Sequence, residues 1–454
     1  MEPSQTPLHN APQSSEETES RLTKHHEQVL TCLRESIGLR ARDRIRGEIS
    51  TSDDAPEGVV NRRPVFLSEK ILNIDKKSPN ILRTTRQSCD PSSQSLLLFG
   101  SMTGHVFLWD SIGSRFIPNK YSLKANDKHV GRISAIDTPL ARPNQSDLLL
   151  TSTASTDGEI KVWKEHETCI ASVSHEAFRP IDPTSRKVIF TKFHPALDTL
   201  LISSAVDGSW AVWDFTRADT SERSALPLFH QQARSPITCS DIHGDGSLLA
   251  CGEESGSVNL WDTRSGESAH TMHRAHNGRM TRLLMHPFDG YSMFTAGSDG
   301  LVKIWNLRYP KLPERSIAAH TGIISDVRLL HHDRSREAYL VTSGFDCQVK
   351  LWDIRGALRE GMDVRTSESQ KNNNLIHQAS LRGKVTACEA VADAPQDEDQ
   401  LPRYRIYGIN SSDAREWTFE QSITPSSTSD VEDADEKSDS SELDELEEAL
   451  NAQG

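Results

Sequence analysis

The sequence predicts an all-β fold, a seven-bladed β-propeller with a short helical N-terminal segment and a disordered acidic C-terminal tail. A recurring tryptophan, the alternation of apolar residues before it and tight polar turns together predict this fold. The tryptophans recur at intervals of 44 to 65 residues, shortest from Trp261 to Trp305 and longest from Trp352 to Trp417. Seven of the eight take part: Trp109, Trp163, Trp213, Trp261, Trp305, Trp352 and Trp417. A repeat of this length with four short strands is typical of a propeller blade.

Each unit ends in a pattern that predicts a strand entered through a hairpin. In six units the residues three and one positions before the tryptophan are apolar, as in Ile160 and Val162. A glycine stands five positions before the tryptophan in five units, and Asp157, Asp207 and Asp299 precede three of these glycines. Because Asp-Gly suits the two positive φ angles of a type I′ turn, we expect a tight hairpin in each unit.

A histidine lies 29 to 38 residues before the tryptophan in four units: His129, His175, His276 and His320. Turn aspartates accompany them: Asp157, Asp207, Asp299 and Asp346. Such pairs suggest the buried network of WD40 repeats, in which aspartate, histidine, a strand hydroxyl and the indole N–H satisfy one another. We interpret the pairs as structural, since a catalytic role would require the same acid–base dyad in four blades.

The repeats place the propeller at residues 64–420. The first and last units are weaker, because Thr103 stands where the turn aspartate is expected and Asp413 is displaced. Terminal repeats are often atypical because they close the array. We expect Pro64–Leu72 to supply the outer strand of the last blade and so to close the ring non-locally.

Both ends of the chain differ in composition from the repeats. Residues 1–20 are predicted to be disordered, residues 21–49 to form one or two short helices, and residues 50–63 to be a linker. The helical segment has an apolar stripe and could dock on its own propeller, bind a partner or contact RNA phosphates. Residues 421–454 carry eleven acidic side chains and one lysine, so about ten of the fourteen net negative charges lie in this tail.

The acidic tail is interpreted as a disordered solvating segment or as a nucleic-acid mimic for basic partners. Ser438 to Ser441 lie among acidic residues and form a candidate site for an acidophilic kinase. Arginines between the blades are either solvated rim charges or contacts for phosphate or an acidic partner. These arginines are Arg132, Arg186, Arg234, Arg279 and Arg334.

The seven cysteines form no C-x-x-C pair, and no apolar run is long enough to cross a membrane. We therefore expect a soluble protein in a reducing compartment, the cytosol or nucleus. The sequence contains no glycine-rich phosphate loop, nucleophile elbow, H-E-x-x-H or cysteine zinc cluster. The expectation is a non-enzyme without catalytic residues, cofactor, metal or small-molecule substrate.

From His129 to Trp352 the blades resemble, in order, the pre-mRNA-processing factor four family of WD40 proteins. The resemblance lies in Ser155–Gly158 with Lys161–Trp163, in Phe193–Pro195 before Asp207–Asp214, and in His243–Leu248 before Trp261–Gly266. Trp210 is distinctive, because WD40 packing does not require a second tryptophan in Ser-Trp-x-x-Trp-Asp. Before the propeller, Gln28–Arg34 and Arg42–Arg46 resemble the two ends of the family's N-terminal motif, but its Glu-Pro-Ile and Leu-Phe-Gly-Glu core is missing.

The resemblance implies a nuclear, non-catalytic scaffold for pre-mRNA splicing in the U4/U6 or tri-snRNP particle. Its partners would be snRNP proteins, namely a processing-factor-three type protein and a cyclophilin type protein. Contact with U4/U6 RNA would be mostly indirect, and no membrane would be involved.

Two other functions remain open from the residues. Trp261–Arg264 and Trp352–Arg355 match the W-D-x-R pattern of substrate receptors for cullin-RING ubiquitin ligases, and Trp305–Arg308 nearly matches it. This pattern makes Arg264, Arg308 and Arg355 candidate partner contacts. The acidic tail would also suit a chaperone or assembly factor for basic clients such as ribosomal proteins or histones.

Overall fold

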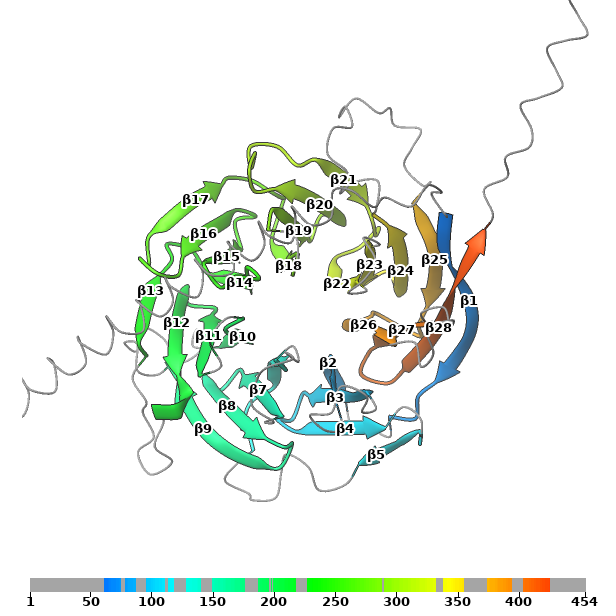
Figure 1. Cartoon of the computed structure of the whole chain (residues 1–454), viewed down its shortest axis with the longest axis horizontal. Coiled ribbons are helices and arrows are strands. Elements are labelled where there is room, and N and C mark those ends of the chain that lie inside the picture. Colours follow the sequence, from blue (N-terminus) through cyan, green and yellow to red (C-terminus); the bar gives the residue numbers. More distant parts are fainter. Residues whose placement is uncertain are drawn as a thin grey trace, which may run out of the picture.

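Seven four-stranded antiparallel sheets surround a central axis and form a seven-bladed propeller (Figure 1). The computed structural model describes residues 61–74, 78–86, 95–110, 113–117, 128–139, 149–175, 187–195, 197, 199–217, 227–287, 290–331, 338–354, 374–393 and 403–424. In this part of the chain the fold is all-β, as predicted, and includes one 3-10 turn, η2 (Phe215–Arg217).

The first four blades comprise the following strands. They are β2 (Pro79–Arg86), β3 (Ser95–Ser101), β4 (Val106–Asp110) and β5 (Arg115–Ile117); β6 (Ile133–Asp137), β7 (Leu150–Ser155), β8 (Glu159–Lys164) and β9 (Thr168–Ser174); β10 (Val188–Phe193), β11 (Leu200–Ala205), β12 (Ser209–Asp214) and β13 (Phe229–Gln232); β14 (Ile237–Ile242), β15 (Leu248–Glu253), β16 (Val258–Asp262) and β17 (Ser268–Met272).

The last three blades complete the ring. They are β18 (Met280–Met285), β19 (Ser292–Gly297), β20 (Leu301–Asn306) and β21 (Arg315–Ala318); β22 (Ile324–His331), β23 (Ala338–Gly344), β24 (Gln348–Asp353) and β25 (Leu375–Ser380); β26 (Ala387–Asp393), β27 (Arg403–Ile409), β28 (Ala414–Thr424) and β1 (Asn61–Ile71).

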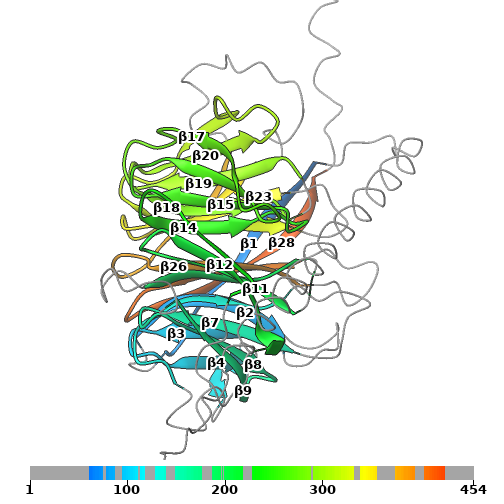
Figure 2. The same ribbon diagram turned by 90° about the vertical axis from the view of Figure 1, so that its left-hand side faces the viewer.

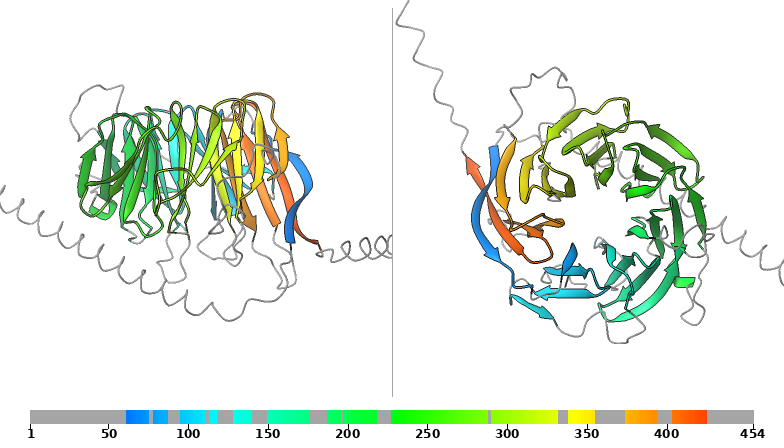
Figure 3. Two further views of the ribbon diagram at one scale, coloured as in Figure 1. Left: turned by 90° about the horizontal axis from the view of Figure 1, so that it is seen from above. Right: turned by 180° about the vertical axis from the view of Figure 1, so that it is seen from behind.

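In every blade the first strand lies nearest the axis and the fourth lies at the outside (Figure 1). The strands run across the thickness of the ring, so their connections lie on its two faces (Figures 2 and 3). One face bears the turns between second and third strands and the segments that enter each first strand. Because these segments include His129, His175, His276 and His320, we call it the histidine face.

Strand β1 closes the ring by pairing with β28, which lies more than 340 residues later in the chain. The register runs from Asn61 opposite Thr424 to Ile71 opposite Arg415, and Leu72 N–H then donates to Ala414 O at 2.8 Å. The two strands lie side by side in Figure 1. The expectation that Pro64–Leu72 supplies the outer strand of the last blade is confirmed.

The hairpins between second and third strands are tight, but they are not the expected type I′ turns. Among the Asp-Gly pairs only the glycines have positive φ, for example 91° at Gly158 and 76° at Gly300. Gly158 N–H donates to Ser155 O at 3.3 Å, which closes a turn whose central residues, Thr156 and Asp157, keep negative φ. This geometry is a type I turn followed by a left-handed glycine, which leaves the aspartate side chain free to accept hydrogen bonds.

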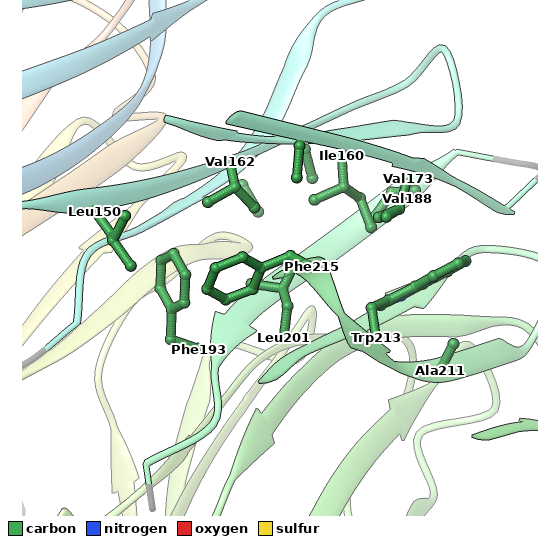
Figure 4. Close-up of a cluster of buried hydrophobic side chains, with 13 residues drawn as sticks. Leu150, Ile160, Val162, Val173, Val188, Phe193, Leu201, Ala211, Trp213 and Phe215 are labelled. Carbon is green, nitrogen blue, oxygen red and sulfur yellow. The ribbon is translucent and has the colours of Figure 1, made fainter. Parts of the chain in front are cut away.

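Apolar side chains fill the space between neighbouring blades. Figure 4 shows one such cluster, in which Ile160 and Val162 of blade 2 face Phe193, Leu201 and Trp213 of blade 3. These side chains alternate along their strands, so each sheet buries both faces against its neighbours. Similar clusters join the other blades.

The predicted disordered residues 1–20, the helical segment 21–49 and most of the linker and acidic tail lie outside the described residues. Strands begin at Asn61 and end at Thr424. Within the described ranges, no helix has the length and apolar character needed to span a bilayer.

Candidate partner-binding face

The histidine, aspartate and tryptophan residues predicted as a network meet in blades 5 and 6. His276 Nδ1 lies 3.0 Å from Asp299 Oδ1, His276 Nε2 lies 2.8 Å from Thr295 Oγ1, and Trp305 Nε1–H donates to the same hydroxyl at 2.8 Å. Blade 6 repeats this geometry with His320, Asp346, Thr342 and Trp352. The network ties the loop that enters a blade to its second and third strands.

Blades 2 and 3 hold variants of this network. In blade 2, His129 Nδ1 is 3.4 Å from Asp157 Oδ2, while Thr153 Oγ1 joins His129 and Trp163. Blade 3 inserts a serine, because Ser209 Oγ bridges His175 Nδ1 at 2.9 Å and Asp207 Oδ1 at 2.6 Å. His175 Nε2 and Trp213 Nε1 both meet Ser203 Oγ at 2.7 Å. The sequence prediction did not include Ser209 as the link between His175 and Asp207.

Of the remaining repeat tryptophans, Trp109 and Trp417 are buried and Trp261 is partly buried, and they differ in their polar contacts. The indole N–H groups of Trp109 and Trp261 have no hydrogen-bond partner within the described part of the chain. In blade 7, Asp413 Oδ2 accepts the Arg382 N–H at 3.1 Å, and the Asn410 amide donates to Arg382 O at 3.0 Å. The displaced aspartate therefore still holds the entering loop. Trp417 is buried in the cluster between blades 6 and 7.

Burial and hydrogen bonding shift the pKa values in these networks. Burial lowers the pKa of His175 to about 4, against the field of Asp207. For Asp157, burial acts to raise the pKa, but the His129 contact and backbone N–H groups lower it well below its usual value. His175 is therefore neutral near pH 7, and its Nδ1–H can donate to Ser209 Oγ, which in turn donates to Asp207 and so fixes the loop.

One network has the composition of a metal site. Ligand atoms of His129, Asp157 and Glu159 lie within 4.8 Å of one another. Asp157 Oδ2 accepts Val130 N–H at 2.8 Å, and Lys161 Nζ lies 3.3 Å from Glu159 Oε2. The carboxylates are therefore already engaged by donors, which favours the loop-holding role.

Two of the three candidate contact arginines lie on the opposite face. Arg264 pairs with Asp262 through Nε at 3.0 Å and Nη2 at 2.6 Å, as in a strand-end pair. Arg308 lies over the Tyr291 ring, 3.6 Å from its centroid, near the exposed Tyr309. Arg355 lies outside the described residues.

Exposed cations gather on the histidine face. Eight are exposed and form no ion pair with any described residue; we call them the rim cations: Lys128, Arg132, Lys187, Arg234, Arg274, Arg279, Arg382 and Lys384. Of the rim arginines predicted from sequence, Arg132, Arg234 and Arg279 belong to this set, whereas Arg186 and Arg334 lie outside the described residues. Glu254 is the one exposed acidic side chain in the described turns and entry loops of this face. The turn aspartates are partly buried.

Apolar side chains accompany the rim cations. Val130, in the loop that enters β6, is 89% exposed, and Met102, in the turn after β3, is 49% exposed. Ile323 and Phe345 are neighbours, since Phe345 N–H donates to Ile323 O at 2.9 Å. Lys384 Nζ lies 5.2 Å from the centroid of the Phe345 ring. We call Ile323, Phe345 and Lys384 the blade 6 corner.

A second charged feature lines the central channel and was not predicted. The inner strands contribute cations and carboxylates that alternate around the ring, and we call this set the channel ring. Its members are Arg83, Asp137, Lys192, Asp241, Arg282, Asp326, Arg328 and Glu389. Positive and negative charges cannot alternate from blade to blade around a ring with an odd number of blades. In blade 6, strand β22 therefore contributes one charge of each sign, Asp326 and Arg328.

Ion pairs of the channel ring join neighbouring blades. Lys192 Nζ is 2.7 Å from Asp241, Arg282 Nε is 2.9 Å from Asp326, and Arg328 Nε is 3.3 Å from Glu389. The second carboxylate oxygens of Asp241 and Asp326 accept backbone N–H groups of the following blade, from Met285 and Cys388. The channel ring therefore connects inner strands without a covalent link.

Burial alters ionisation in the channel ring. It raises the pKa of Asp137 to about 6 and that of Glu389 to about 8, although Lys192 and Arg83 oppose these shifts. The ring encloses a cavity of about 130 Å³ that is lined by Asp137, Lys192, Asp241 and Arg282. Because each cation already contacts an acidic side chain of the ring, the channel ring is better suited to joining blades than to binding a ligand.

Comparison with known proteins identifies the repeats. The family model described as "WD domain, G-beta repeat" matches residues 227–262, 266–306 and 311–353. Each match starts with the outer strand of one blade and continues through three strands of the next, so the sequence repeat is offset from the blade by one strand. This offset explains why β1 belongs to the last blade.

Curated relatives match parts of this chain at low identity. The GATOR2 complex protein WDR24 of Homo sapiens is 27% identical over 214 residues, which cover 47% of this chain and 26% of WDR24. Nucleoporin Nup43 of Homo sapiens is 26% identical over 244 residues, which cover 53% of this chain and 60% of Nup43. Protein transport protein SEC31 of Chaetomium globosum is 25% identical over 248 residues, which cover 51% of this chain and 18% of SEC31. The chain thus spans from about a fifth to three fifths of these relatives.

Proposed function

We propose that this chain of WD40 repeats is a non-catalytic scaffold subunit that binds partner proteins through its histidine face. The rim cations carry this proposal, since eight exposed Lys and Arg side chains form no ion pair with any residue that the structure describes. Unpaired cations beside exposed apolar residues suit a partner whose surface combines carboxylates with apolar side chains. The relatives support the general role, because WDR24 and Nup43 are named as a complex protein and a nucleoporin.

The specific assembly we propose is the U4/U6 or tri-snRNP particle in the nucleus. Support comes from the resemblance of the blades, including Trp210, which is fully buried against Trp261 and Phe229. The partners would be snRNP proteins of the processing-factor-three and cyclophilin types, with U4/U6 RNA held mostly indirectly. None of the three relatives above bears a splicing name, so this assignment rests on the sequence resemblance.

The alternative of a ubiquitin-ligase receptor rests on the W-D-x-R arginines. Arg264 already pairs with Asp262, which gives this tetrapeptide a structural role. Arg308 and the exposed Tyr291, Tyr309 and Leu312 are the residues of the opposite face that fit an adaptor contact. Charge reversal on the two faces separates the two proposals.

The experiment compares two triple variants after capture of tagged protein from nuclear extract. The face variant carries Arg132→Glu, Arg279→Glu and Lys384→Glu. The control variant makes the same charge change on the opposite face with Lys164→Glu, Lys311→Glu and Arg403→Glu. Proteins and RNAs that co-purify are identified by mass spectrometry and sequencing.

We expect the wild type and the control variant to recover U4 and U6 RNAs with snRNP proteins. The face variant should recover about tenfold less, as expected when charge complementarity at an interface is reversed. Equal recovery by the face variant would rule out the histidine face. If the wild type recovers a ligase adaptor and the control variant does not, the result would instead support the receptor function. If the wild type recovers only basic client proteins, the result would support the chaperone function.

A further inference from the structure

The acidic tail and the rim cations have opposite charges within one chain. The segment from Asp430 to Glu448 contains all eleven acidic residues of the tail and one lysine, Lys437. The rim cations are eight exposed positive charges on the histidine face, and none of them pairs with an acidic group in the described part of the chain. At moderate salt, charges of opposite sign attract one another over distances of up to about 10 Å before the salt screens them. Because the tail is part of the same chain, its effective concentration near the rim cations is also high.

Apolar residues of the tail match the face as well. Leu443, Leu446 and Leu450 lie three and four residues apart in the sequence, a spacing that puts side chains on one face if the segment becomes helical. The blade 6 corner offers Ile323 and Phe345, which are 39% and 38% exposed, next to Lys384. A polypeptide of alternating leucines and carboxylates fits this combination better than a nucleic acid, which has no aliphatic side chains to bury.

The chain is long enough for the two to meet. Strand β28 belongs to blade 7, next to the blade 6 corner, and it ends at Thr424 on the opposite face. Its eleven residues span about 36 Å at ~3.3 Å per residue. The eighteen residues from 425 to 442 reach about 60 Å when extended, so Leu443 can reach the histidine face around the outside of the ring.

We propose that the acidic tail of this chain, through the segment Leu443–Leu450, docks on the rim cations at the blade 6 corner and competes there with partner proteins. This inference rests on the proposed function, because it concerns the same face. The tail acts as an intramolecular competitor whose effective concentration is set by its tether. At an effective concentration in the millimolar range, a segment with even modest affinity reduces the apparent affinity of a partner by about tenfold or more. Phosphorylation of Ser438, Ser440 or Ser441 would add charge and strengthen the competition.

The test uses a fluorescent peptide with the sequence of residues 428–452 as probe. Its binding to the full chain and to a chain that ends at residue 424 is measured by fluorescence anisotropy at low and high salt. We expect the shortened chain to bind the peptide at least about tenfold more tightly than the full chain, and high salt to weaken binding. A peptide in which Leu443, Leu446 and Leu450 are alanine should bind more weakly.

Two matched controls assign the site and keep the proposals apart. In the shortened chain, Arg279→Glu with Lys384→Glu should abolish peptide binding, whereas Lys311→Glu with Arg403→Glu should preserve it. Equal binding to full and shortened chains, or no binding to either, would overturn the inference. If partner capture depends on the histidine face but the peptide does not bind, the proposed function survives alone. If the peptide binds there but partner capture is unaffected by the face variant, docking of the tail survives, and its competition with partners is overturned together with the proposed function.

Discussion

Cys347 occupies a position that five other blades fill with glycine. Its φ is 69°, and the glycines at the equivalent turn position have φ values from 76° to 91°. A Cβ atom disfavours this left-handed conformation by about 1–2 kcal/mol, so the blade 6 turn holds a strained residue. Asp346, the preceding residue, still accepts the His320 contact, so the network compensates for the strain.

Replacing Cys347 with glycine should therefore stabilise the protein. We expect Cys347→Gly to raise the free energy of unfolding by about 1 kcal/mol in urea denaturation, because the left-handed φ becomes unstrained. Cys347→Ala removes the thiol but retains the Cβ atom and should give no gain. Equal gains from both variants would show that the thiol, not the backbone, is responsible.

His175 should make stability depend on pH below neutrality. Burial lowers its pKa to about 4 in the folded state, whereas the unfolded chain has the ordinary value of 6.5. Between pH 6.5 and 4 the unfolded state therefore binds more protons, and the free energy of unfolding falls as the pH falls. The contribution of this one histidine has a slope approaching about 1.4 kcal/mol per pH unit within that window.

The pH prediction is checked by urea denaturation of His175→Gln between pH 7.5 and 4.5. The variant should lose some stability at pH 7.5, because Ser203 and Ser209 lose their partner, but its stability should fall less steeply with pH than that of the wild type. His270→Gln, at an exposed position, should retain the wild-type slope. Parallel curves for wild type and His175→Gln would contradict the assignment.

At the scale of strands, the inner strands carry both the packing of the blades and the channel ring. Asp326 on β22 is fully buried and connects three elements: it contacts Arg282 of β18, Arg328 of its own strand and the N–H of Cys388 on β26. Removing one partner of a buried ion pair leaves the others uncompensated. The pair of Asp262 and Arg264 at the end of β16 is reached by water, so a charge left alone there is solvated.

Asp326→Asn should destabilise the protein by about 3–5 kcal/mol, since two guanidinium groups lose their carboxylate in a buried site. Asp262→Asn, which weakens the half-buried pair with Arg264, should cost less than about 1 kcal/mol, because water reaches both side chains. Chemical denaturation of both variants at neutral pH measures the contrast. Similar costs at the two sites would mean that the channel ring does not bind the blades together.

The whole ring depends on one non-local contact, the pairing of β1 with β28. Arg415 Nη1 contacts Glu69 at 2.6 Å, and Phe66 packs on Phe419 and stacks on His377 of the neighbouring blade. Without β1, the edge of β28 and the apolar side chains beneath it would be exposed to water. An open propeller with such an edge would be prone to aggregation.

A chain that starts at residue 73 should therefore lose its closed fold, with a melting temperature lowered by more than about 10 °C or no cooperative transition. A chain that starts at residue 59 retains β1 and should melt within a few degrees of the full chain. Adding a peptide of residues 59–74 to the shorter chain should restore part of the transition by strand complementation. A stable, cooperative fold without β1 would show that the ring does not need this closure.

The sequence by itself determined the features that repeat within a blade. Thr153 and Trp163 lie ten residues apart and meet across one hairpin, and Thr295 and Trp305 have the same spacing, so local pattern predicts the pair. The atypical first and last repeats also predicted that an N-terminal strand closes the ring. Period-two alternation and turn residues act over short chain distances, which is why their signal is strong.

Tertiary structure alone decided which charges meet across blades. Lys192 and Asp241 lie 49 residues apart, and Arg282 and Asp326 lie 44 apart, with no pattern that distinguishes them from solvated charges. Rim cations such as Lys384 gather only because every entry loop emerges on the same face. The type of turn at Asp157 and the relay by Ser209 likewise depend on backbone geometry that the residue types permit but do not specify. Side chains on different blades become neighbours when the ring closes, and closure is a property of the whole chain.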